Sequence, residues 1–83
     1  MLKSLASEER TVVFYESPHR ILKTLDNLHE AMQADGTRRV VIARELTKMH
    51  EEIIDATVET LPEIAKKLTV KGEFVIVLAG ATL

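Results

Sequence analysis

Three short apolar runs constrain the fold of this 83-residue chain more than any other feature of its sequence. Residues 11–15, 40–43 and 74–79 are rich in β-branched, aliphatic and aromatic side chains, without the alternation of a strand that has one wet side. Such runs are typical of strands that are buried on both faces. The longest run, Phe74 to Ala79, is far shorter than a membrane-spanning helix. The sequence therefore predicts a buried sheet, with the last strand in its interior.

Two amphipathic segments lie between the apolar runs and predict helices packed on the sheet. The first begins at Ser17-Pro18, where the serine hydroxyl can cap the helix and proline suits the first helical position. Gly36 can end this helix in the left-handed conformation. The second helix begins at a capping box of Thr60 and Glu63. The apolar stripes of the two helices are Ile21, Leu22, Leu25, Leu28 and Met32, and then Leu61, Ile64, Ala65 and Leu68.

A further extended segment, residues 53–58, alternates apolar and polar side chains and is typical of an edge strand. The charged residues 44–52 connect it to the second apolar run, and residues 2–6 resemble the last turns of a helix. The element order α-β-α-β-β-α-β predicts the α/β class, with a single mixed sheet of about four strands and helices packed on it. The first two strands suit a right-handed crossover with parallel directions.

Composition limits the classes of function. With 83 residues, 46% of them hydrophobic and 29% charged, the chain suits one globular domain and no second core. The formal net charge of −2 gives no global attraction to a phosphate backbone, so any nucleic-acid contact must be local. The absence of cysteine excludes disulfide and thiolate chemistry. The N-terminus lacks the apolar stretch of a secretion signal, which predicts a cytoplasmic protein without a membrane partner.

Two polar segments, residues 16–20 and 44–51, directly follow the first two buried strands. Ligands of open α/β sheets bind at the carboxyl ends of strands, where the loops converge. Structural interpretations stay open for both segments: Ser17 can be a helix cap, Arg20 can pair with Glu16, and Arg44 can pair with Glu45. A cation at a helix start opposes the helix dipole by about 0.3 to 1 kcal/mol, which favours a functional reason for His19 and Arg20. We predict no metal site, because His19, His50 and Glu51 lack metal-ligand spacing on one rigid element.

Three motifs resemble successive signatures of one family. They are FYESPHR at 14–20, ARELTK at 43–48 with His50-Glu51 after it, and GEFV at 72–75. In this order and spacing the chain resembles the C-terminal half of the tetrapyrrole methylase superfamily, and within it the family of ribosomal RNA small-subunit methyltransferase I. The resemblance extends over nearly all of residues 11–80.

The resemblance implies an enzyme of two α/β halves with S-adenosylmethionine in the cleft between them. Such enzymes methylate a cytidine ribose 2′-hydroxyl in small-subunit ribosomal RNA. Residues 1–83 would then be a C-terminal subdomain whose glycine-rich N-terminal half is absent, with truncation at both ends, so we expect the isolated chain to be inactive. The last strand would lie between the first two. A strand missing before Met1 would leave the first strand as an exposed edge, free to pair with a second copy in a homodimer.

The resemblance also implies roles for residues in the two polar segments. The cofactor-binding candidates are Glu16, Ser17, Arg44, Glu45 and Leu46. The candidates for removing the proton of the 2′-hydroxyl are His19, Glu45, Lys48 and His50, among which the sequence does not choose. The candidates for contacts with ribosomal RNA are Arg20 and Lys48.

Two other functions remain open. The intact protein could be another methylase of the same superfamily, acting on a tetrapyrrole or on a modified protein residue. The chain could instead be a free-standing small α/β binding or oligomerisation module. The cofactor hypothesis requires Ser17 and Glu45 to lie on the same rim of the sheet.

Overall fold

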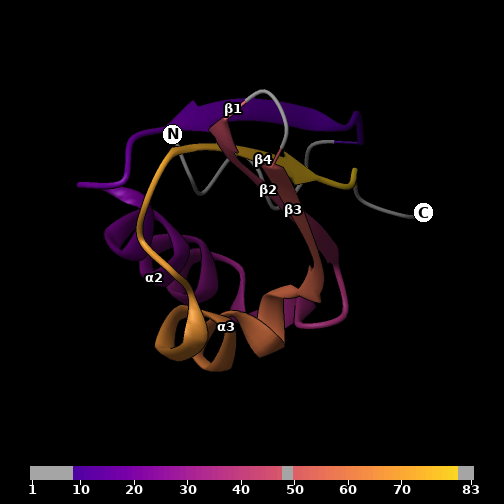
Figure 1. Cartoon of the computed structure of the whole chain (residues 1–83). Coiled ribbons are helices and arrows are strands. Elements are labelled where there is room, and N and C mark those ends of the chain that lie inside the picture. Colours follow the sequence, from indigo (N-terminus) through magenta and orange to yellow (C-terminus); the bar gives the residue numbers. More distant parts are fainter. Residues whose placement is uncertain (1–8, 48–49, 81–83) are drawn as a thin grey trace.

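The computed structural model describes residues 9–47 and 50–80, which form one layer of sheet and one layer of helices (Figure 1). The elements, labelled as in Figure 1, are β1 (Val12–Glu16), α2 (Ile21–Ala31), η1 (Gln33–Asp35), β2 (Arg39–Thr47), β3 (His50–Thr57), η2 (Val58–Thr60), α3 (Leu61–Lys67) and β4 (Glu73–Leu78). The helix end expected at residues 2–6 lies outside the described residues. The predicted α/β class with a sheet of four strands is confirmed.

The sheet has the strand order β1-β4-β2-β3, so the last strand lies between the first two, as predicted. β4 is antiparallel to both of its neighbours, and β2 is antiparallel to β3. β1 and β2 therefore run in the same direction, as a crossover requires, but they are not paired with each other. All three neighbouring pairs are antiparallel, whereas we expected a mixed sheet, because β4 separates the two strands that are parallel.

The strands that form the hairpin reach further than predicted. β2 continues to Thr47 and β3 starts at His50, so most of the charged segment 44–52 is strand instead of connection. The expected edge position of β3 is confirmed. The sequence pattern missed the extension because Arg44, Glu45 and Glu52 are poor strand formers on their own.

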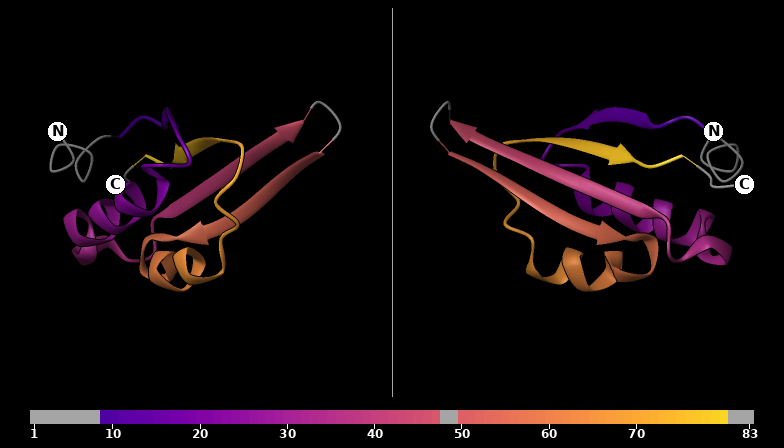
Figure 2. Two further views of the ribbon diagram at one scale, coloured as in Figure 1. Left: turned by 60° about the vertical axis from the view of Figure 1, so that its left-hand side comes forward. Right: turned by 90° about the vertical axis from the view of Figure 1, so that its right-hand side faces the viewer.

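The core lies between the sheet and the two helices, which cover the same face of the sheet (Figure 2). Phe74, Ile76 and Leu78 alternate along β4 and are fully buried against α2 and its neighbours. The predicted stripe of the first helix is confirmed at Ile21, Leu25, Leu28 and Met32, but Leu22 is exposed, because one residue turns the helix by about 100° and so places Leu22 beside the buried face. The other buried apolar residues are Val40, Ile42, Ala56, Val58 and Leu61.

The other face of the sheet is apolar and carries no covering layer from the described residues. Val13, Tyr15 and Ile53 on this outer face are 53%, 79% and 66% exposed. Tyr15 is in register with Val75, which is in register with Ala43 and then Ile53, so these side chains form one continuous row. The prediction that β1 is buried on both faces is therefore wrong. The reason is that both helices pack on one face, and β-branched composition does not specify which face is covered.

Two local predictions about turns and caps are corrected. Gly36 has a right-handed φ of −62° instead of a left-handed one, and a Cβ at this position would lie 3.2 Å from the Glu59 side chain, so close approach favours glycine here. The capping box predicted at Thr60 and Glu63 forms one turn earlier, where Thr57 and Thr60 cap η2. Within the described residues, no helix is long and apolar enough to cross a membrane.

The one-sided core gives a direct test of stability. We predict that Phe74→Ala lowers the free energy of unfolding by about 3 to 5 kcal/mol, because it removes a fully buried aromatic side chain. The matched control Tyr15→Ala, on the exposed face, changes it by no more than about 1 kcal/mol. Urea denaturation followed by circular dichroism measures both values. Equal losses for the two variants would contradict the placement of the core.

Candidate functional site

The ends of β1 and β2 meet at one edge of the sheet, which we call the carboxyl rim: residues 16–20, residues 44–47 and the start of β4 at Glu73. Phe74 is in register with Glu16 on one side and with Arg44 on the other. Two strand spacings of about 4.8 Å therefore separate the ends of β1 and β2. Ser17 and Glu45 lie on the same rim, so the geometric demand of the cofactor hypothesis is met.

The connection after β1 is fixed by the side chain of Glu16. Its carboxylate accepts a hydrogen bond of 2.6 Å from the Thr24 hydroxyl on α2 and one of 3.2 Å from the Ser17 backbone N–H. The Ser17 carbonyl accepts hydrogen bonds from the backbone N–H groups of Arg20 and Ile21, at 3.1 and 3.0 Å. Glu16 therefore ties the end of β1 to the first turn of α2, and both of its carboxylate oxygens are engaged within the fold.

Ser17 does not cap the helix with its hydroxyl, contrary to the sequence prediction. The helix begins at Ile21 with Arg20 at the N-cap position and no side-chain cap bond, because residues 18–20 form a turn that delays the helix start. In residues 9–47 and 50–80 the Ser17 hydroxyl has no hydrogen-bond partner. It is available for a ligand at the rim.

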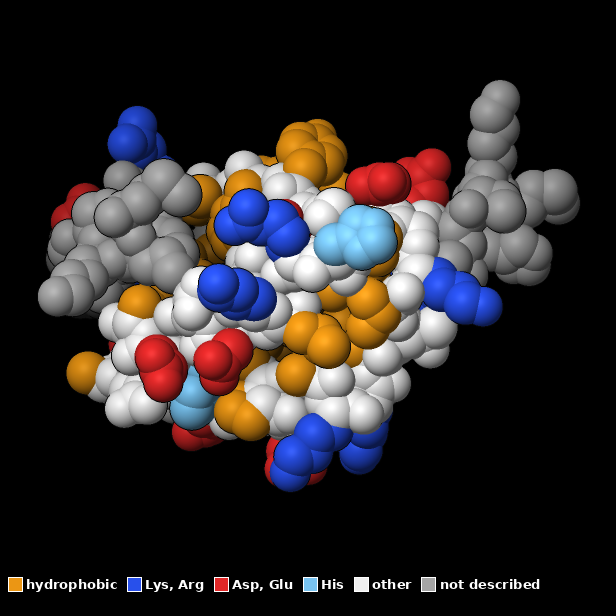
Figure 3. Space-filling view, turned by 90° about the vertical axis from the view of Figure 1, so that its left-hand side faces the viewer, with side chains coloured by type: hydrophobic (Ala, Val, Ile, Leu, Met, Phe, Trp, Pro, Cys, Tyr) orange, Lys and Arg blue, Asp and Glu red, His pale blue; other side chains and the backbone are white. Residues whose placement is uncertain are grey.

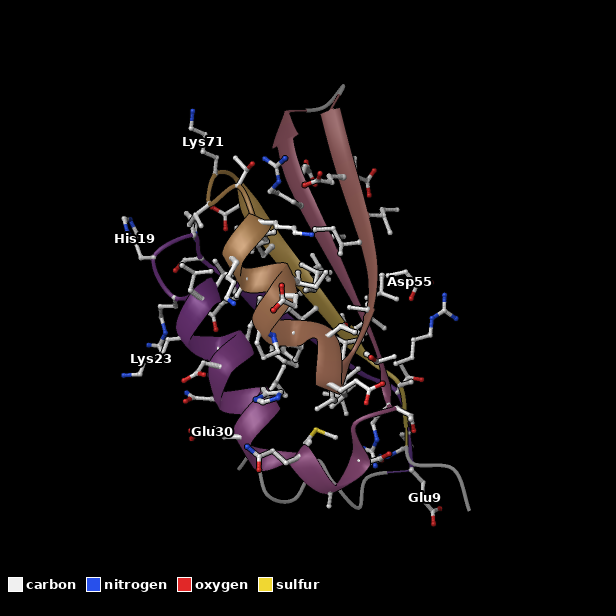
Figure 4. All side chains as sticks on the ribbon, turned by 90° about the horizontal axis from the view of Figure 1, so that it is seen from below. Glu9, His19, Lys23, Glu30, Asp55 and Lys71 are labelled. Atoms are coloured by element: carbon white, nitrogen blue, oxygen red, sulfur yellow. The ribbon has the colours of Figure 1, made fainter. Side chains whose placement is uncertain are left out.

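His19 and Arg20 follow in this turn and are exposed to solvent. The Arg20 Nε lies 3.7 Å from a Glu16 carboxylate oxygen, with 73% of the arginine side chain exposed. A pair with this geometry and exposure contributes little to stability. Figure 4 shows the His19 side chain pointing away from the body of the domain.

Arg44, at the end of β2, lies on the helix-covered face in the same row as Phe74. Its side chain is only 9% exposed, and its Nε and Nη2 atoms each lie 2.9 Å from one carboxylate oxygen of Glu52 across the hairpin. The Nη1 atom is buried and has no partner among the described residues. A buried donor without an acceptor costs about 1 to 3 kcal/mol, so this nitrogen is suited to an acceptor from outside the described fold.

Glu45 points to the outer face, because successive side chains of a strand alternate between faces. The ion pair of Arg44 with Glu45 that we considered from the sequence is therefore wrong, and the partner of Arg44 is Glu52. Glu45 is in register with Glu51 on β3 and with Glu73 on β4, so three carboxylates share one row. Like charges directly opposite each other destabilise a sheet. Within the described part of the chain, no three acidic or histidine side chains are arranged to hold a metal ion.

Two of the remaining candidates, Leu46 and His50, belong to the β2–β3 hairpin. A bulge interrupts the pairing between Glu45 and Thr47, so the backbone of Leu46 leaves the regular ladder. His50 starts β3 opposite Thr47. Lys48 lies outside the described residues.

The structure thus brings the two predicted segments to one rim but divides their side chains between the two faces of the sheet. Glu16 and Arg44 point toward the helices and are held by other residues, whereas Glu45 is exposed on the opposite face. Sequence reasoning missed Thr24 and Glu52, the partners that hold Glu16 and Arg44. For Glu52 the hairpin register would have been a usable signal, since it places residue 52 opposite residue 44.

Comparison with known proteins identifies the family to which this rim belongs. A family model described as "Tetrapyrrole (Corrin/Porphyrin) Methylases" matches residues 1–62. The chain belongs to the tetrapyrrole methylase family. The resemblance inferred from the three sequence motifs is confirmed.

Curated relatives of this tetrapyrrole methylase chain carry the name ribosomal RNA small subunit methyltransferase I. The protein from Synechocystis sp. is 46% identical over 82 residues, which cover 99% of this chain and 29% of that protein. The protein from Thermotoga maritima is 44% identical over 81 residues, which cover 96% of this chain and 35% of that protein. The chain thus spans about a third of the length of these relatives.

A solved structure has the same fold as this tetrapyrrole methylase chain. Cobalt precorrin-4 methyltransferase, a cobalamin biosynthetic enzyme, superposes with a TM-score of 0.73 at 17% sequence identity. The match covers 94% of this chain and 32% of that one. At this identity, the likeness supports the arrangement of strands and helices and says nothing of the substrate.

The anchoring role of Glu16 predicts the effect of removing its partner. Thr24→Val keeps the side-chain shape but removes the hydroxyl that donates to the Glu16 carboxylate. We expect it to lower the free energy of unfolding by about 1 to 2 kcal/mol, because a hydrogen bond to a charged group is lost. Thr69→Val, at an exposed position between α3 and β4, is the control and is expected to change little. Thermal or urea unfolding measures both, and equal effects would contradict the anchor.

Proposed function

We propose that this chain is the C-terminal subdomain of an S-adenosylmethionine-dependent methyltransferase that acts on ribosomal RNA. The observation that carries the proposal is the carboxyl rim, where the FYESPHR and ARELTK motifs follow the parallel strands β1 and β2 on either side of β4. The curated relatives named as ribosomal RNA methyltransferases support the substrate class. Since ribosomal RNA is the substrate, the compartment we propose is the cytoplasm.

The residues of the rim fit S-adenosylmethionine as one wall of its site. The Ser17 hydroxyl and the exposed Glu45 carboxylate can bind polar groups of the cofactor, and the irregular backbone at Leu46 can do the same. Arg44 brings a buried Nη1 donor that has no acceptor among the described residues, which suits a carboxylate or carbonyl oxygen supplied from outside them. Glu16 is better suited to hold the connection than to bind the cofactor, since Thr24 and the Ser17 N–H already occupy its oxygens.

The reaction that we propose is transfer of a methyl group to a cytidine ribose 2′-hydroxyl. S-adenosylmethionine supplies the methyl group from its sulfonium. The hydroxyl oxygen forms the new bond to carbon, the bond from that carbon to sulfur breaks, and the hydroxyl proton passes to a base. Among the candidates, His19 and Glu45 are exposed on the rim, His50 starts β3 beside it, and Lys48 is outside the described residues. Arg20 and Lys48 are the proposed RNA contacts.

The chain spans about a third of its relatives, so most of the cofactor site is proposed to lie in the remaining polypeptide. A glycine-rich N-terminal half would supply the opposite wall of the cleft. A tetrapyrrole substrate is the second candidate, and it rests on the description of the matching family model as tetrapyrrole methylases. The relatives at 44 to 46% identity favour RNA over it.

Calorimetric titration with S-adenosylmethionine tests the incomplete site. We expect this chain to bind with a Kd weaker than about 1 mM, equivalent to less than about 4 kcal/mol, because only one wall is present. The full-length relative from Thermotoga maritima serves as the positive control and is expected to bind at least tenfold more tightly. Tight binding by the isolated chain, or methyl transfer to ribosomal RNA by it, would contradict the proposal that the site is completed by the missing half.

We also propose that two copies associate through β1, which lies at the edge of the sheet. The outer side of an edge strand presents unpaired backbone N–H and C=O groups that can pair with another strand. Val13 and Tyr15 on the same strand are exposed and add apolar surface next to this edge.

Light scattering tests the dimer with two matched variants. Val13→Lys places a charge on the β1 edge, and Ile53→Lys places one on the β3 edge at a similarly exposed apolar position. The unaltered chain and Ile53→Lys are expected to form dimers in a concentration-dependent manner, whereas Val13→Lys is expected to stay monomeric. A monomer in all three samples, or the same response of both variants, would reject pairing through β1.

A further inference from the structure

Four basic side chains lie beside the carboxyl rim on its α2 side: His19, Arg20, Lys23 and Lys71, which we call the basic strip. His19 and Arg20 belong to the turn after β1, Lys23 follows in α2, and Lys71 precedes β4. All four are exposed. Figure 4 labels His19, Lys23 and Lys71, which lie along one side of the molecule and point away from it. Figure 3 shows Lys, Arg and His side chains, with Asp and Glu side chains among them, around hydrophobic ones on the face that carries α2.

Within the described residues, two members of the basic strip lack an ion pair, as does Lys67 on α3. Elsewhere, Arg39, Arg44 and Lys66 are paired with Asp55, Glu52 and Glu63, respectively. Lys23 and Lys71 have no ion pair within residues 9–47 and 50–80, and Arg20 approaches Glu16 only at 3.7 Å. The chain therefore presents the exposed cations of Lys23 and Lys71 next to a rim that also carries the carboxylates of Glu45 and Glu73.

The backbone that carries the strip is fixed at both ends. The bonds of Glu16 to Thr24 and to the Ser17 N–H hold the turn that presents His19 and Arg20. At the other end of the strip, the Lys71 backbone N–H donates a hydrogen bond to the Thr69 carbonyl. Gly72, where the chain turns into β4, has a φ of +82°, a value that favours glycine. The positive groups are thus held near the rim before any partner binds, which lowers the ordering cost of binding.

We propose that the basic strip binds the sugar–phosphate backbone of the RNA substrate and leads the strand to the carboxyl rim. This inference rests on the proposed function, since it assigns a surface to the RNA that the enzyme is proposed to methylate. Phosphate contacts by lysine and arginine position a nucleic acid without reading its sequence. Exposed lysine and arginine side chains suit this type of contact more than base recognition.

Fluorescence anisotropy with a labelled single-stranded RNA of about 20 nucleotides tests the strip on this chain alone. The double variant Lys23→Gln, Lys71→Gln removes two proposed phosphate contacts. The matched control Arg39→Gln, Lys66→Gln removes the same charge from ion-paired positions. Each phosphate contact with a single strand contributes about −0.7 to the slope of log K against log salt concentration, so the slope of the first variant should become shallower by about 1.4.

We expect the strip variant to lose about tenfold in RNA affinity at 20 mM KCl, while the control loses less than about twofold. Equal losses in both variants, or no measurable binding by the unaltered chain at this salt concentration, would overturn the inference. Circular dichroism and urea midpoints confirm that both variants are folded. The assay contains no cofactor, so a negative binding result would reject the role of the basic strip without testing the proposed methyl transfer. Conversely, the full-length Thermotoga maritima relative could bind RNA without methylating it. That result would reject the proposed function but not the RNA-binding role of the basic strip.

Discussion

Insertion of β4 between β1 and β2 is the constraint on which the rest of the structure depends. Phe74 pairs with Glu16 and with Arg44, so a single residue aligns the end of β1 with the last part of β2. Its side chain is fully buried, so the same residue also fixes which face of the strands is covered by the helices. A shift of one residue in either pairing would turn every side chain of that strand to the other face. The carboxyl rim is therefore a consequence of register and packing together.

Much of the fold was predictable because the apolar runs are long enough to specify strands and the motifs specify their order. The interior position of β4 followed from Phe74 to Ala79 and from the family resemblance, and the structure confirms it. The uncovered outer face was not predictable, since residues such as Val13 and Tyr15 suit a sheet surface whether or not a second layer covers it. If β2 had been predicted to continue through Arg44 and Glu45, the alternation of side chains along a strand would have placed these two residues on opposite faces of the sheet.

The sequence predicted where the candidate site lies, but not which residues hold its side chains. The two polar segments do meet at one rim, as their places after parallel strands implied. The partners of Glu16 and Arg44 could not be read from the sequence, because they depend on how α2 and β3 pack against the strand ends. The Nη1 of Arg44, which has no partner in residues 9–47 and 50–80, and the row of Glu45, Glu51 and Glu73 both disfavour the folded state. Natural sequences tend to break rules of stability where they carry function, and here both exceptions lie at the rim.

The shared rim can be tested most directly by NMR of the labelled chain, through nuclear Overhauser contacts between backbone protons of neighbouring strands. The structure predicts contacts from Phe74 to both Glu16 and Arg44, together with contacts from Glu73 to Glu45. Contacts of Phe74 with only one of the two strands, or direct contacts between β1 and β2, would contradict it. In either case Ser17 and Glu45 would no longer form one wall of a common site.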